Sequence, residues 1–413
     1  MTSHADRISN PQLIIVGGGP AGVMAGLLFA RAGCTVRILE KHADFFRDFR
    51  GDTVHPSTME ILDQLGMLGQ FLKRPHNRLD QAELRIAGRT WTIGDLSHLD
   101  TPAPFIAMMP QWDFLDFLRG EAAAFPGFQL EMEASVESFL EEQAFPNKGR
   151  VVGVRLADGR ELKAPLTIAA DGRASIVRST GMLAVEDLGA PMDVFWFRVP
   201  KSKDEIGGLR GSVERGRLLV MIDRGDYWQC AFLIPKGRAE EYQTRGIEAI
   251  CNEVAAAAPE IDLAELDDIS DLHLLTVKVD RLTCWQRPGL LAIGDAAHAM
   301  SPIGGIGINL AIQDAVAAAN VLAGPLVRGE PVDRLLCKVQ DRRMFPTRAI
   351  QAAQVVAQDR IIGRLLKPGP PLTGAPLIVR LFDRFPLLRR IPGRFVGLGV
   401  RRERVRSPAA VRR

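Results

Sequence analysis

Three glycines near the N-terminus have a spacing that suits nucleotide chemistry. Gly17, Gly19 and Gly22 form a G-x-G-x-x-G pattern that follows an apolar strand and opens a helix. Because glycine has no side chain, backbone N–H groups at such a helix start can approach the diphosphate of a dinucleotide. Glu40 ends the next expected strand, where its carboxylate can accept hydrogen bonds from ribose hydroxyl groups. The spacing predicts a dinucleotide site, and a glycine turn without a ligand is the alternative interpretation.

Two later segments could complete this site. One follows a strand and reads Asp-Gly-Arg-Ala-Ser-Ile-Val-Arg, with the candidate residues Asp171, Gly172, Ser175 and Arg178. The other begins with a Gly-Asp pair and runs into a helix, with the candidate residues Gly294, Asp295, Pro302, Gly304, Gly305, Gly307 and Asn309. Its carboxylate can hold a polyol hydroxyl group, and its helix start offers N–H donors and a positive dipole to an anionic heterocycle. A surface Asp-Gly turn and a merely well-capped helix are the alternatives.

Taken in this order, the three motifs resemble those of the class A, single-component flavoprotein monooxygenases, the group of para-hydroxybenzoate hydroxylase and the ubiquinone-pathway hydroxylases. The resemblance covers roughly residues 12 to 345. It implies that the first motif and Glu40 bind the ADP half of FAD. It also implies that the Asp171 motif serves the diphosphate region and NAD(P)H, and that Gly294 with Asp295 contacts the ribityl chain.

Further residues are assigned by the same resemblance. Arg50 matches the family's arginine beside FAD, with Arg47 as a rival, and Gln111 matches its polar residue near the adenosine and ribityl groups. Pro302 and the glycine loop after it would lie beside the isoalloxazine ring. His55 could act as a base toward a phenol, since imidazole titrates near neutrality, and a structural hydrogen bond is its alternative role.

The resemblance implies an FAD-dependent monooxygenase that uses NADH or NADPH as co-substrate. It would hydroxylate an aromatic or polyketide-like small molecule through a flavin C4a-hydroperoxide. An FAD oxidoreductase that inserts no oxygen, a flavin-dependent halogenase and a flavin-binding regulator are the alternatives. Trp228 with Ile234 and Pro235 faintly resembles a halogenase signature, but Cys230 stands where that signature has a second tryptophan. Tyr227 and Trp228 could line the substrate pocket or pack in the core.

The hydrophobic pattern indicates an α/β protein whose Rossmann-like, FAD-binding lobe carries an inserted, mostly antiparallel β-sheet substrate lobe and C-terminal helices. A strand at Leu13–Val16, a helix to about Ala32 and a strand to Glu40 form a βαβ unit. A helix is expected from about Ser57 to Leu72, with Ser57 and Glu60 as a capping box. The expected FAD-binding lobe comprises residues 1–74, 105–184 and 280–345, the substrate-binding lobe 75–104 and 185–279, and the C-terminal helical, Arg-rich segment 346–413.

Charge and composition limit the partners, the location and the metal content that the sequence predicts. The formal charge of +3 over 413 residues gives no reason to expect nucleic acid as a partner. Residues 380–413 nevertheless hold eleven Arg and two acidic residues. Residues 377–385 alternate apolar and basic side chains at helical spacing, which predicts either a helix docked on the protein or a peripheral contact with an anionic membrane. The polar N-terminus shows no signal-peptide pattern, and no group of residues has metal-ligand spacing, so a cytoplasmic location and no metal are expected.

Overall fold

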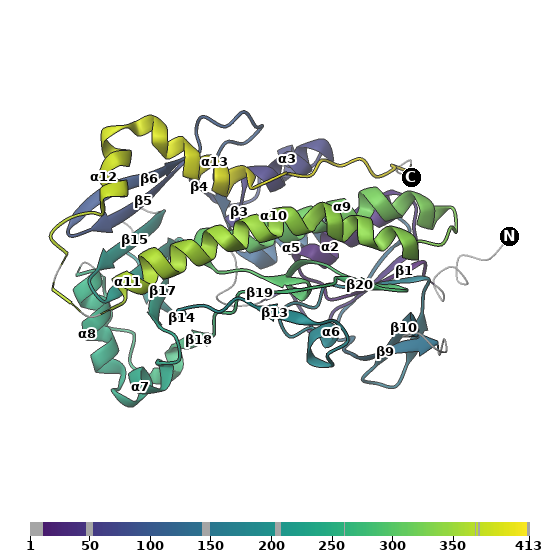
Figure 1. Ribbon diagram of the computed structural model, residues 1–413, viewed down its shortest axis with the longest axis horizontal. Coiled ribbons are helices and arrows are strands. Elements are labelled where there is room, and N and C mark those ends of the chain that lie inside the picture. The colour runs from purple at the N-terminus through teal and green to yellow at the C-terminus, as the bar shows by residue number, and fades with distance from the viewer. Residues whose placement is uncertain are drawn as a thin grey trace.

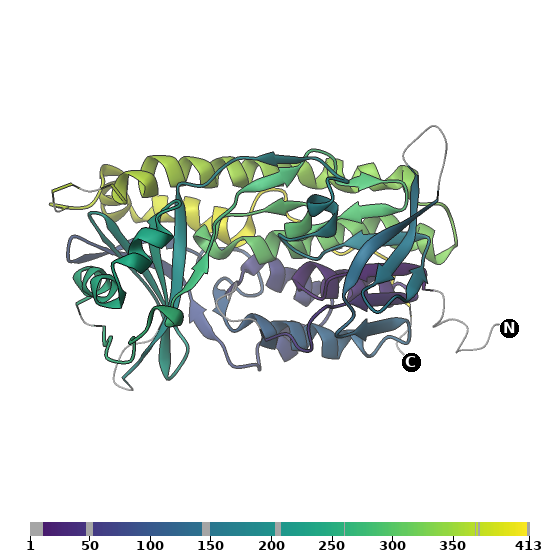
Figure 2. The same cartoon turned by 90° about the horizontal axis from the view of Figure 1, so that it is seen from below.

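The molecule is elongated, with one large β-sheet at each end and two long helices, α9 (Gly307–Val327) and α10 (Leu336–Ala357), along its length (Figures 1 and 2). The computed structural model describes residues 11–46, 53–142, 149–202, 208–259, 261–367, 369–370 and 372–410. Arg50 and its rival Arg47 lie outside the described residues.

One sheet has six strands, and five of them are parallel. Their order is β20 (Gln286–Arg287), β21 (Leu290–Ala292), β12 (Leu166–Ala169), β1 (Leu13–Val16), β2 (Val36–Leu39) and β8 (Phe128–Glu131), with β20 antiparallel at one edge. Alternate residues of β1 face opposite sides, because the side-chain period of a strand is two. Leu13 and Ile15 pack on helices, whereas Ile14 and Val16 pack on a second layer of strands. An unbroken apolar strand such as β1 is what burial on both faces requires.

The two layers that cover this sheet differ in kind. Helices α2 (Pro20–Arg31), α5 (Gln111–Ala122) and α9 lie on one face. The three-stranded meander β9 (Val136–Glu142), β10 (Arg150–Leu156) and β11 (Glu161–Lys163) lies on the other. The βαβ unit and its placement therefore match the expectation from the sequence.

The sheet at the opposite end has seven strands from two distant parts of the chain (Figure 2). It runs β18 (His273–Leu275), β14 (Met192–Pro200), β17 (Tyr227–Pro235), β16 (Arg217–Asp223), β15 (Leu209–Glu214), β5 (Gln81–Ile86) and β6 (Arg89–Asp95). All pairs are antiparallel except β15 with β5. Helices α7 (Ala239–Thr244) and α8 (Ile247–Ala257) cover one face. The predicted fold class, α/β with a mostly antiparallel second sheet, is confirmed.

The two faces of this sheet show whether Trp228 lines the substrate pocket or packs in the core. Trp228 is buried in the cluster that packs against α7 and α8. Trp196 and Ile222 instead pack against Ile106 and Met108, which belong to the part of the chain nearer the nucleotide motifs. Trp228 is thus a core residue on the helix-covered face.

Short elements connect the two sheets. Two small sheets consist of β13 (Val185–Asp187), β19 (Asp280–Leu282) and β22 (His298–Ala299), and of β3 (Thr53–Val54), β7 (Ile106–Met108) and β4 (Asn77–Leu79). The remaining short helices are α6 (Ile176–Ser179), η1 (Ile269–Asp271), η2 (Gly294–Ala296), η3 (Ile303–Gly305), η4 (Asp333–Leu335), η5 (Gln358–Ile362) and α11 (Gly363–Leu365).

The predicted helix from Ser57 to Leu72 is wrong in its extent and its cap. Two helices occupy this stretch, α3 (Pro56–Gln64) and α4 (Leu68–Phe71), separated at Gly66, whose φ is +72°. Pro56 starts α3 with His55 as the N-cap residue, so Ser57 lies inside the helix and forms no capping box. Glu60 instead pairs with Arg402 across 2.9 Å.

The C-terminal segment forms α12 (Leu377–Arg384), η6 (Pro386–Arg389) and α13 (Arg390–Leu398). An extended tail follows and returns to the end of the molecule that holds the six-stranded sheet (Figure 1). The expectation that α12 docks its apolar face on the protein is wrong for most of that face. Leu377 is 80% exposed, and Ile378, Leu381 and Phe385 are exposed as well, while Val379 is buried. The apolar face of α12 is therefore largely open to solvent.

One described helix, Ile303–Val327, is long and apolar enough to cross a membrane by length and composition alone. However, 72% of its most apolar stretch is buried inside the protein. A buried core helix of a protein has the same composition, and α9 packs against α2 and α10 here.

Candidate active site

The parallel strands β1, β2, β12 and β21 end at the same level. One of the three predicted motifs follows each of β1, β12 and β21, and Glu40 follows β2. Val16 is in register with Leu39 on one side and Ala169 on the other, and Ala169 is in register with Ala292. Ligands of open parallel sheets bind at the carboxyl ends of the strands. The fold therefore brings together three motifs that are more than a hundred residues apart in sequence.

The glycine turn is tight where it meets its neighbours and open where a ligand would approach. Gly17 has a φ of +103°, and a Cβ there would lie 2.5 Å from the Ala170 carbonyl oxygen. A Cβ at Gly22 would lie 1.9 Å from the Gly17 carbonyl oxygen, so neither position accepts a side chain. A Cβ at Gly19, the N-cap of α2, would meet nothing within 4 Å. The start of α2 thus presents open space next to a positive helix end.

Glu40 lies directly beside this turn. Its Oε2 accepts a hydrogen bond from the Gly18 N–H over 2.7 Å, and its Oε1 accepts one from the His42 N–H over 3.1 Å. The residue is only 8% exposed. Each carboxylate oxygen has two lone pairs, so these bonds fix the carboxylate and leave capacity for ribose hydroxyl groups.

The second motif follows β12 and faces the glycine turn. Asp171 Oδ2 accepts from the Ile176 N–H over 2.9 Å, and burial raises the pKa of Asp171, against lowering by hydrogen bonds from Ser175 and Ile176. Gly172 has a φ of +80°, and Ser175 is fully buried.

Arg178 has its partners inside the protein. Its guanidinium donates to both carboxylate oxygens of Asp280, over 2.6 and 3.0 Å, and to the Ala296 carbonyl over 2.8 Å. Only 8% of its side chain is exposed. Arg178 therefore ties the second motif to β19 and to the third motif.

The third motif packs directly on the first. Gly294 has a φ of +59°, and a Cβ there would lie 3.0 Å from the Cβ of Ala21 in α2. Asp295 Oδ2 accepts from Arg173 Nε over 3.1 Å, and Arg173 Nη2 donates to the Met300 carbonyl over 3.1 Å. Arg173 lies within the second motif, but the sequence analysis gave it no role.

A buried ionic network supports the Gly-Asp pair. Asp314 Oδ2 accepts from the Gly294 N–H over 3.1 Å and lies 2.6 Å from His298 Nε2, while Asp314 Oδ1 accepts from Arg343 Nε over 2.8 Å. The side chains of Asp314, His298 and Arg343 are fully buried. Burial alone would raise the pKa of Asp314, but His298 and Arg343 outweigh it and lower that pKa. Asp314 and Arg343 were not predicted from the sequence, because no local pattern in α9 or α10 signals which carboxylate will meet a glycine N–H or which arginine will pair with it.

The glycine loop before α9 lies against β3. Gly304 and Gly305 have φ values of +76° and +61°, and a Cβ at Gly305 would lie 2.3 Å from Thr53 Oγ1. Pro302 precedes this loop as the N-cap of η3, and Gly307 is the first residue of α9. Positive φ values at two successive glycines turn the backbone in a way that other residues rarely adopt.

Asn309 holds this loop to the segment before α3. Its Oδ1 accepts from the His55 N–H over 2.9 Å and from Thr58 Oγ1 over 2.7 Å. Its Nδ2 donates to the carbonyls of Thr53 and Gly305, both over 3.3 Å. The side chain predicted to contact the cofactor thus makes four hydrogen bonds within the protein.

His55 is fully buried between α3 and α13. Its Nδ1 donates to the Val396 carbonyl over 2.8 Å, so Nδ1 carries the proton and Nε2 is an acceptor. Nε2 has no hydrogen-bond partner among the residues that the structure describes. Burial lowers the pKa of His55 to about 4 despite the bond to Val396, so the ring is neutral at pH 7. Gln111, which the family resemblance assigns to the region of the adenosine and ribityl groups, is half-buried at the start of α5.

Comparison with known families decides what this arrangement is. The family described as "FAD binding domain" matches residues 11–353, most of the chain. The chain belongs to that family. Among the flavoprotein's relatives, the 6-methylpretetramide 4-monooxygenase of Streptomyces rimosus is 32% identical over 423 residues, which cover 98% of this chain and 97% of that protein. A 12-dehydrotetracycline 5-monooxygenase/anhydrotetracycline 6-monooxygenase of Streptomyces rimosus subsp. rimosus is 26% identical, covering 94% of this chain and 76% of the relative.

A solved structure supports the fold of the flavoprotein. PqsL of Pseudomonas aeruginosa, described as a probable FAD-dependent monooxygenase, superposes with a TM-score of 0.72 at 21% identity and covers 86% of this chain and 98% of its own. The predicted family, the enzyme class and the use of FAD with NAD(P)H are thereby confirmed, and the protein is an FAD-dependent monooxygenase.

The described residues of the monooxygenase fit FAD. A turn closed to side chains at Gly17 and Gly22 but open at Gly19 suits a diphosphate, and a fixed carboxylate at Glu40 suits a ribose. Among the described residues no group of His, Cys, Asp and Glu could hold a metal ion.

Proposed function

We propose that this monooxygenase hydroxylates a phenol-bearing, fused-ring polyketide. The observation that carries the proposal is the 32% identity over 98% of the chain to a 6-methylpretetramide 4-monooxygenase. A second relative that is named for two tetracycline precursors supports the same substrate class. A relative that is named for a single-ring phenol, a para-nitrophenol 4-monooxygenase, is only 23% identical over 80% of this chain, so the higher identity to the first relative favours fused rings.

Each half of the cofactor has proposed ligands in this chain. The first motif with Glu40 would hold the ADP half, and the Asp171 motif the diphosphate region. Gly294 and Asp295 would hold the ribityl chain, and bound FAD would supply electron transfer from NAD(P)H and oxygen activation. Arg50, outside the described residues, and Gln111 stay in this proposal as further FAD contacts. Gly304 would present its backbone N–H group to the flavin ring, with Pro302 beside it, whereas the Gly305 N–H donates to the Pro302 carbonyl over 3.1 Å and shapes the loop.

We assign the two lobes to separate tasks. Residues 1–74, 105–184 and 280–345 would bind FAD, and residues 75–104 and 185–279 would bind substrate. The seven-stranded sheet directs Trp196 and Ile222 toward Ile106 and Met108. An apolar face at this position would orient an aromatic substrate and exclude water.

His55 would act through its Nε2 lone pair. Because Nδ1 keeps its proton on the Val396 carbonyl, Nε2 can only accept a hydrogen bond. A pKa of about 4 makes His55 a weak base, so accepting a hydrogen bond from a phenol or from the flavin fits it better than full proton removal.

The test uses the FAD-loaded enzyme with NADPH or NADH and labelled dioxygen. A fused-ring polyketide phenol should accelerate flavin reduction, and the product should carry one labelled oxygen atom per nicotinamide consumed. Single-ring phenols serve as the comparison. Faster and better coupled turnover with single-ring phenols would reject the substrate class, and a product without labelled oxygen would reject hydroxylation altogether.

A peripheral contact with an anionic membrane is a second proposal, supported by the exposed apolar side chains of Leu377, Ile378 and Phe385 on α12. Arg380 and Arg384 on the same helix are exposed and would meet lipid phosphates. Co-sedimentation with anionic vesicles should occur at low salt and weaken at high salt, and Leu377→Asp should reduce it. Equal binding to zwitterionic vesicles would reject the role of anionic lipid, and no binding at all would reject the membrane contact.

A further inference from the structure

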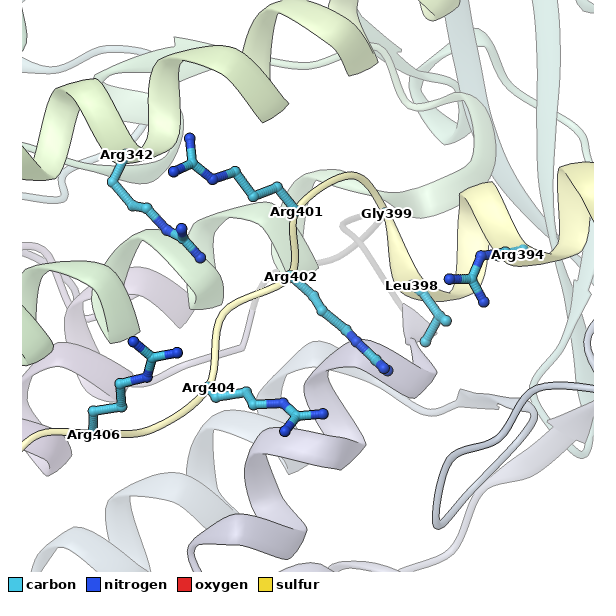
Figure 3. Close-up of a pocket in the computed structure, with 8 residues that line it drawn as sticks. All are labelled: Arg342, Arg394, Leu398, Gly399, Arg401, Arg402, Arg404 and Arg406. Carbon is cyan, nitrogen blue, oxygen red and sulfur yellow. The ribbon is translucent and has the colours of Figure 1, made fainter.

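A groove lined almost entirely by arginine lies on the C-terminal tail, outside the proposed flavin site (Figure 3). Its volume is about 450 Å³, within the range of small-molecule pockets. α10 and α13 contribute one guanidinium each and the tail contributes four, from Arg342, Arg394, Arg401, Arg402, Arg404 and Arg406. None of the described residues that were predicted for the flavin site lines it.

The groove has more positive charge than its own carboxylates can balance. Arg342 pairs with Glu403 over 2.6 Å, and Arg402 pairs with Glu60 over 2.9 Å. Arg404 only approaches Glu60, at 3.9 Å. For Arg394, Arg401 and Arg406, no ion pair occurs among the residues that the structure describes. Two carboxylates thus face six guanidinium groups, and like charges held this close repel unless an anion joins them.

The tail that supplies these arginines is fixed in place. The Glu403 N–H donates to Gln313 Oε1 over 3.2 Å, the Val405 N–H to Gln64 Oε1 over 2.8 Å, and the Arg406 N–H to Asn320 Oδ1 over 2.6 Å. Three amide side chains from α3 and α9 therefore hold an extended segment of the tail in place. A pre-arranged set of donors loses less entropy on binding than a mobile basic tail does.

The backbone turn that leads from α13 into the tail contains two residues with positive φ. Gly399 has a φ of +68°, and Arg401, which is not a glycine, has a φ of +53°. A side chain in this region costs energy that the surrounding structure must offset. Figure 3 shows the result: Arg401 extends from the tail beside Arg342 of α10, while Arg402 and Arg404 extend toward α3.

We propose that this arginine groove binds a small molecule through a diphosphate or phosphate-ester group. Guanidinium groups bind phosphate oxygens in pairs of parallel hydrogen bonds, and several guanidiniums around one hollow suit an anion of more than one charge. Among the described residues, Leu398 is the only apolar side chain in the lining and no aromatic ring contributes, so an acyl chain has no partner there. Recognition would rest on the phosphate groups, in NADPH, ADP or inorganic diphosphate alike. The proposal does not depend on the substrate class proposed above.

The test is calorimetric titration of inorganic diphosphate into the FAD-loaded enzyme at low salt. FAD already fills its own site, so the heat reports a second site. Arg401→Gln and Arg406→Gln should each weaken the affinity about tenfold, the loss expected for one charged hydrogen-bonded contact. Arg348→Gln, an exposed arginine on α10 that does not line the groove, is the matched control and should change nothing. Flavin absorbance should be the same in all variants, which reports intact folding.

Three outcomes decide the proposal. Binding that falls in the groove variants alone supports it, and equal competition by ADP and NADPH identifies the phosphate groups as the recognised part. An equal loss in Arg348→Gln would mean diffuse charge attraction and would overturn it. Retention on phosphatidic acid vesicles together with no diphosphate binding would overturn it in favour of a lipid contact.

Discussion

His55 and Val396 join the nucleotide end of the chain to its C-terminal helix: the imidazole Nδ1–H donates to the Val396 carbonyl over 2.8 Å. The bond crosses 341 residues of sequence and is shielded from solvent. It fixes the tautomer of His55 and places α13 over the start of α3. Protonation would keep this bond but would place a positive charge on a fully buried ring, and this burial is what lowers the pKa of His55.

Acid should therefore weaken the fold through His55. The folded-state pKa of His55 is about 4, below its ordinary value of 6.5, so the unfolded chain binds a proton that the folded chain excludes between these values. The contribution of His55 is fully present above pH 6.5 and declines as the pH falls toward 4, by about 3 kcal/mol in total. Urea unfolding at pH 7.5 and pH 5 would measure the decline.

His55→Asn provides the control for that measurement. The asparagine amide can still donate to the Val396 carbonyl, but it does not titrate. Its unfolding free energy should change less between the two pH values than that of the wild-type protein. The same variant lacks the Nε2 acceptor, so coupled hydroxylation should fall more than FAD binding. Equal pH dependence of stability in the two proteins would show that His55 does not carry the effect.

Gly19→Ala should lower the affinity for FAD without unfolding the protein. A Cβ at Gly19 meets no protein atom within 4 Å, so the added methyl group would occupy the space that a diphosphate needs. Gly120→Ala on α5 meets no atom within 4 Å either and lies away from the motifs, which makes it the matched control. We expect at least a tenfold weaker FAD affinity for Gly19→Ala by fluorescence titration, about 1.4 kcal/mol, and an unchanged FAD affinity for Gly120→Ala. FAD-free Gly120→Ala should melt no lower than the wild-type protein, because alanine is more stable than glycine inside a helix.

Glu40→Gln should separate FAD from FMN. The glutamine oxygen can still accept from the Gly18 N–H, but the amide nitrogen cannot accept from a ribose hydroxyl group. The loss of one charge-assisted hydrogen bond costs about 1.5–3 kcal/mol, which is roughly tenfold or more in affinity. FMN lacks the adenosine half and should bind the variant and the wild-type protein equally. If FMN affinity falls as much as FAD affinity, Glu40 does not act on the ADP half.

Asp314→Asn should destabilise the enzyme severely. It removes the carboxylate that serves Gly294, His298 and Arg343, and leaves a fully buried guanidinium with only Glu403 nearby, at 3.6 Å. Breaking a buried ion pair costs about 3–5 kcal/mol. The exposed pair of Asp116 and Arg119 is the comparison, and Asp116→Asn should have no measurable effect on urea unfolding. A small effect at Asp314 would show that this buried ion pair does not contribute to stability.

Local patterns were enough to predict the nucleotide end of the protein. The glycine turn, the apolar strand before it and Glu40 lie within thirty residues, and each is constrained by backbone geometry that only certain residue types permit. The prediction of a capping box at the start of α3 was wrong, because the decisive contacts are not those that the local spacing indicates. Ser57 and Glu60 have capping spacing, but Pro56 begins the helix one residue earlier and Glu60 is drawn to Arg402 from the far end of the chain.

The sequence by itself determined that the chain would build a dinucleotide turn on a parallel sheet, since periodicity and glycine spacing act over a few residues. Only the tertiary structure decided the partners of the long polar side chains. Arg178 faces Asp280, Asn309 holds its own loop, Asp314 lies under Gly294, and the tail arginines gather in one groove. These pairings depend on where distant segments meet in space, and a side chain at a given position has the same sequence signature whether its partner is a ligand or another residue of the protein.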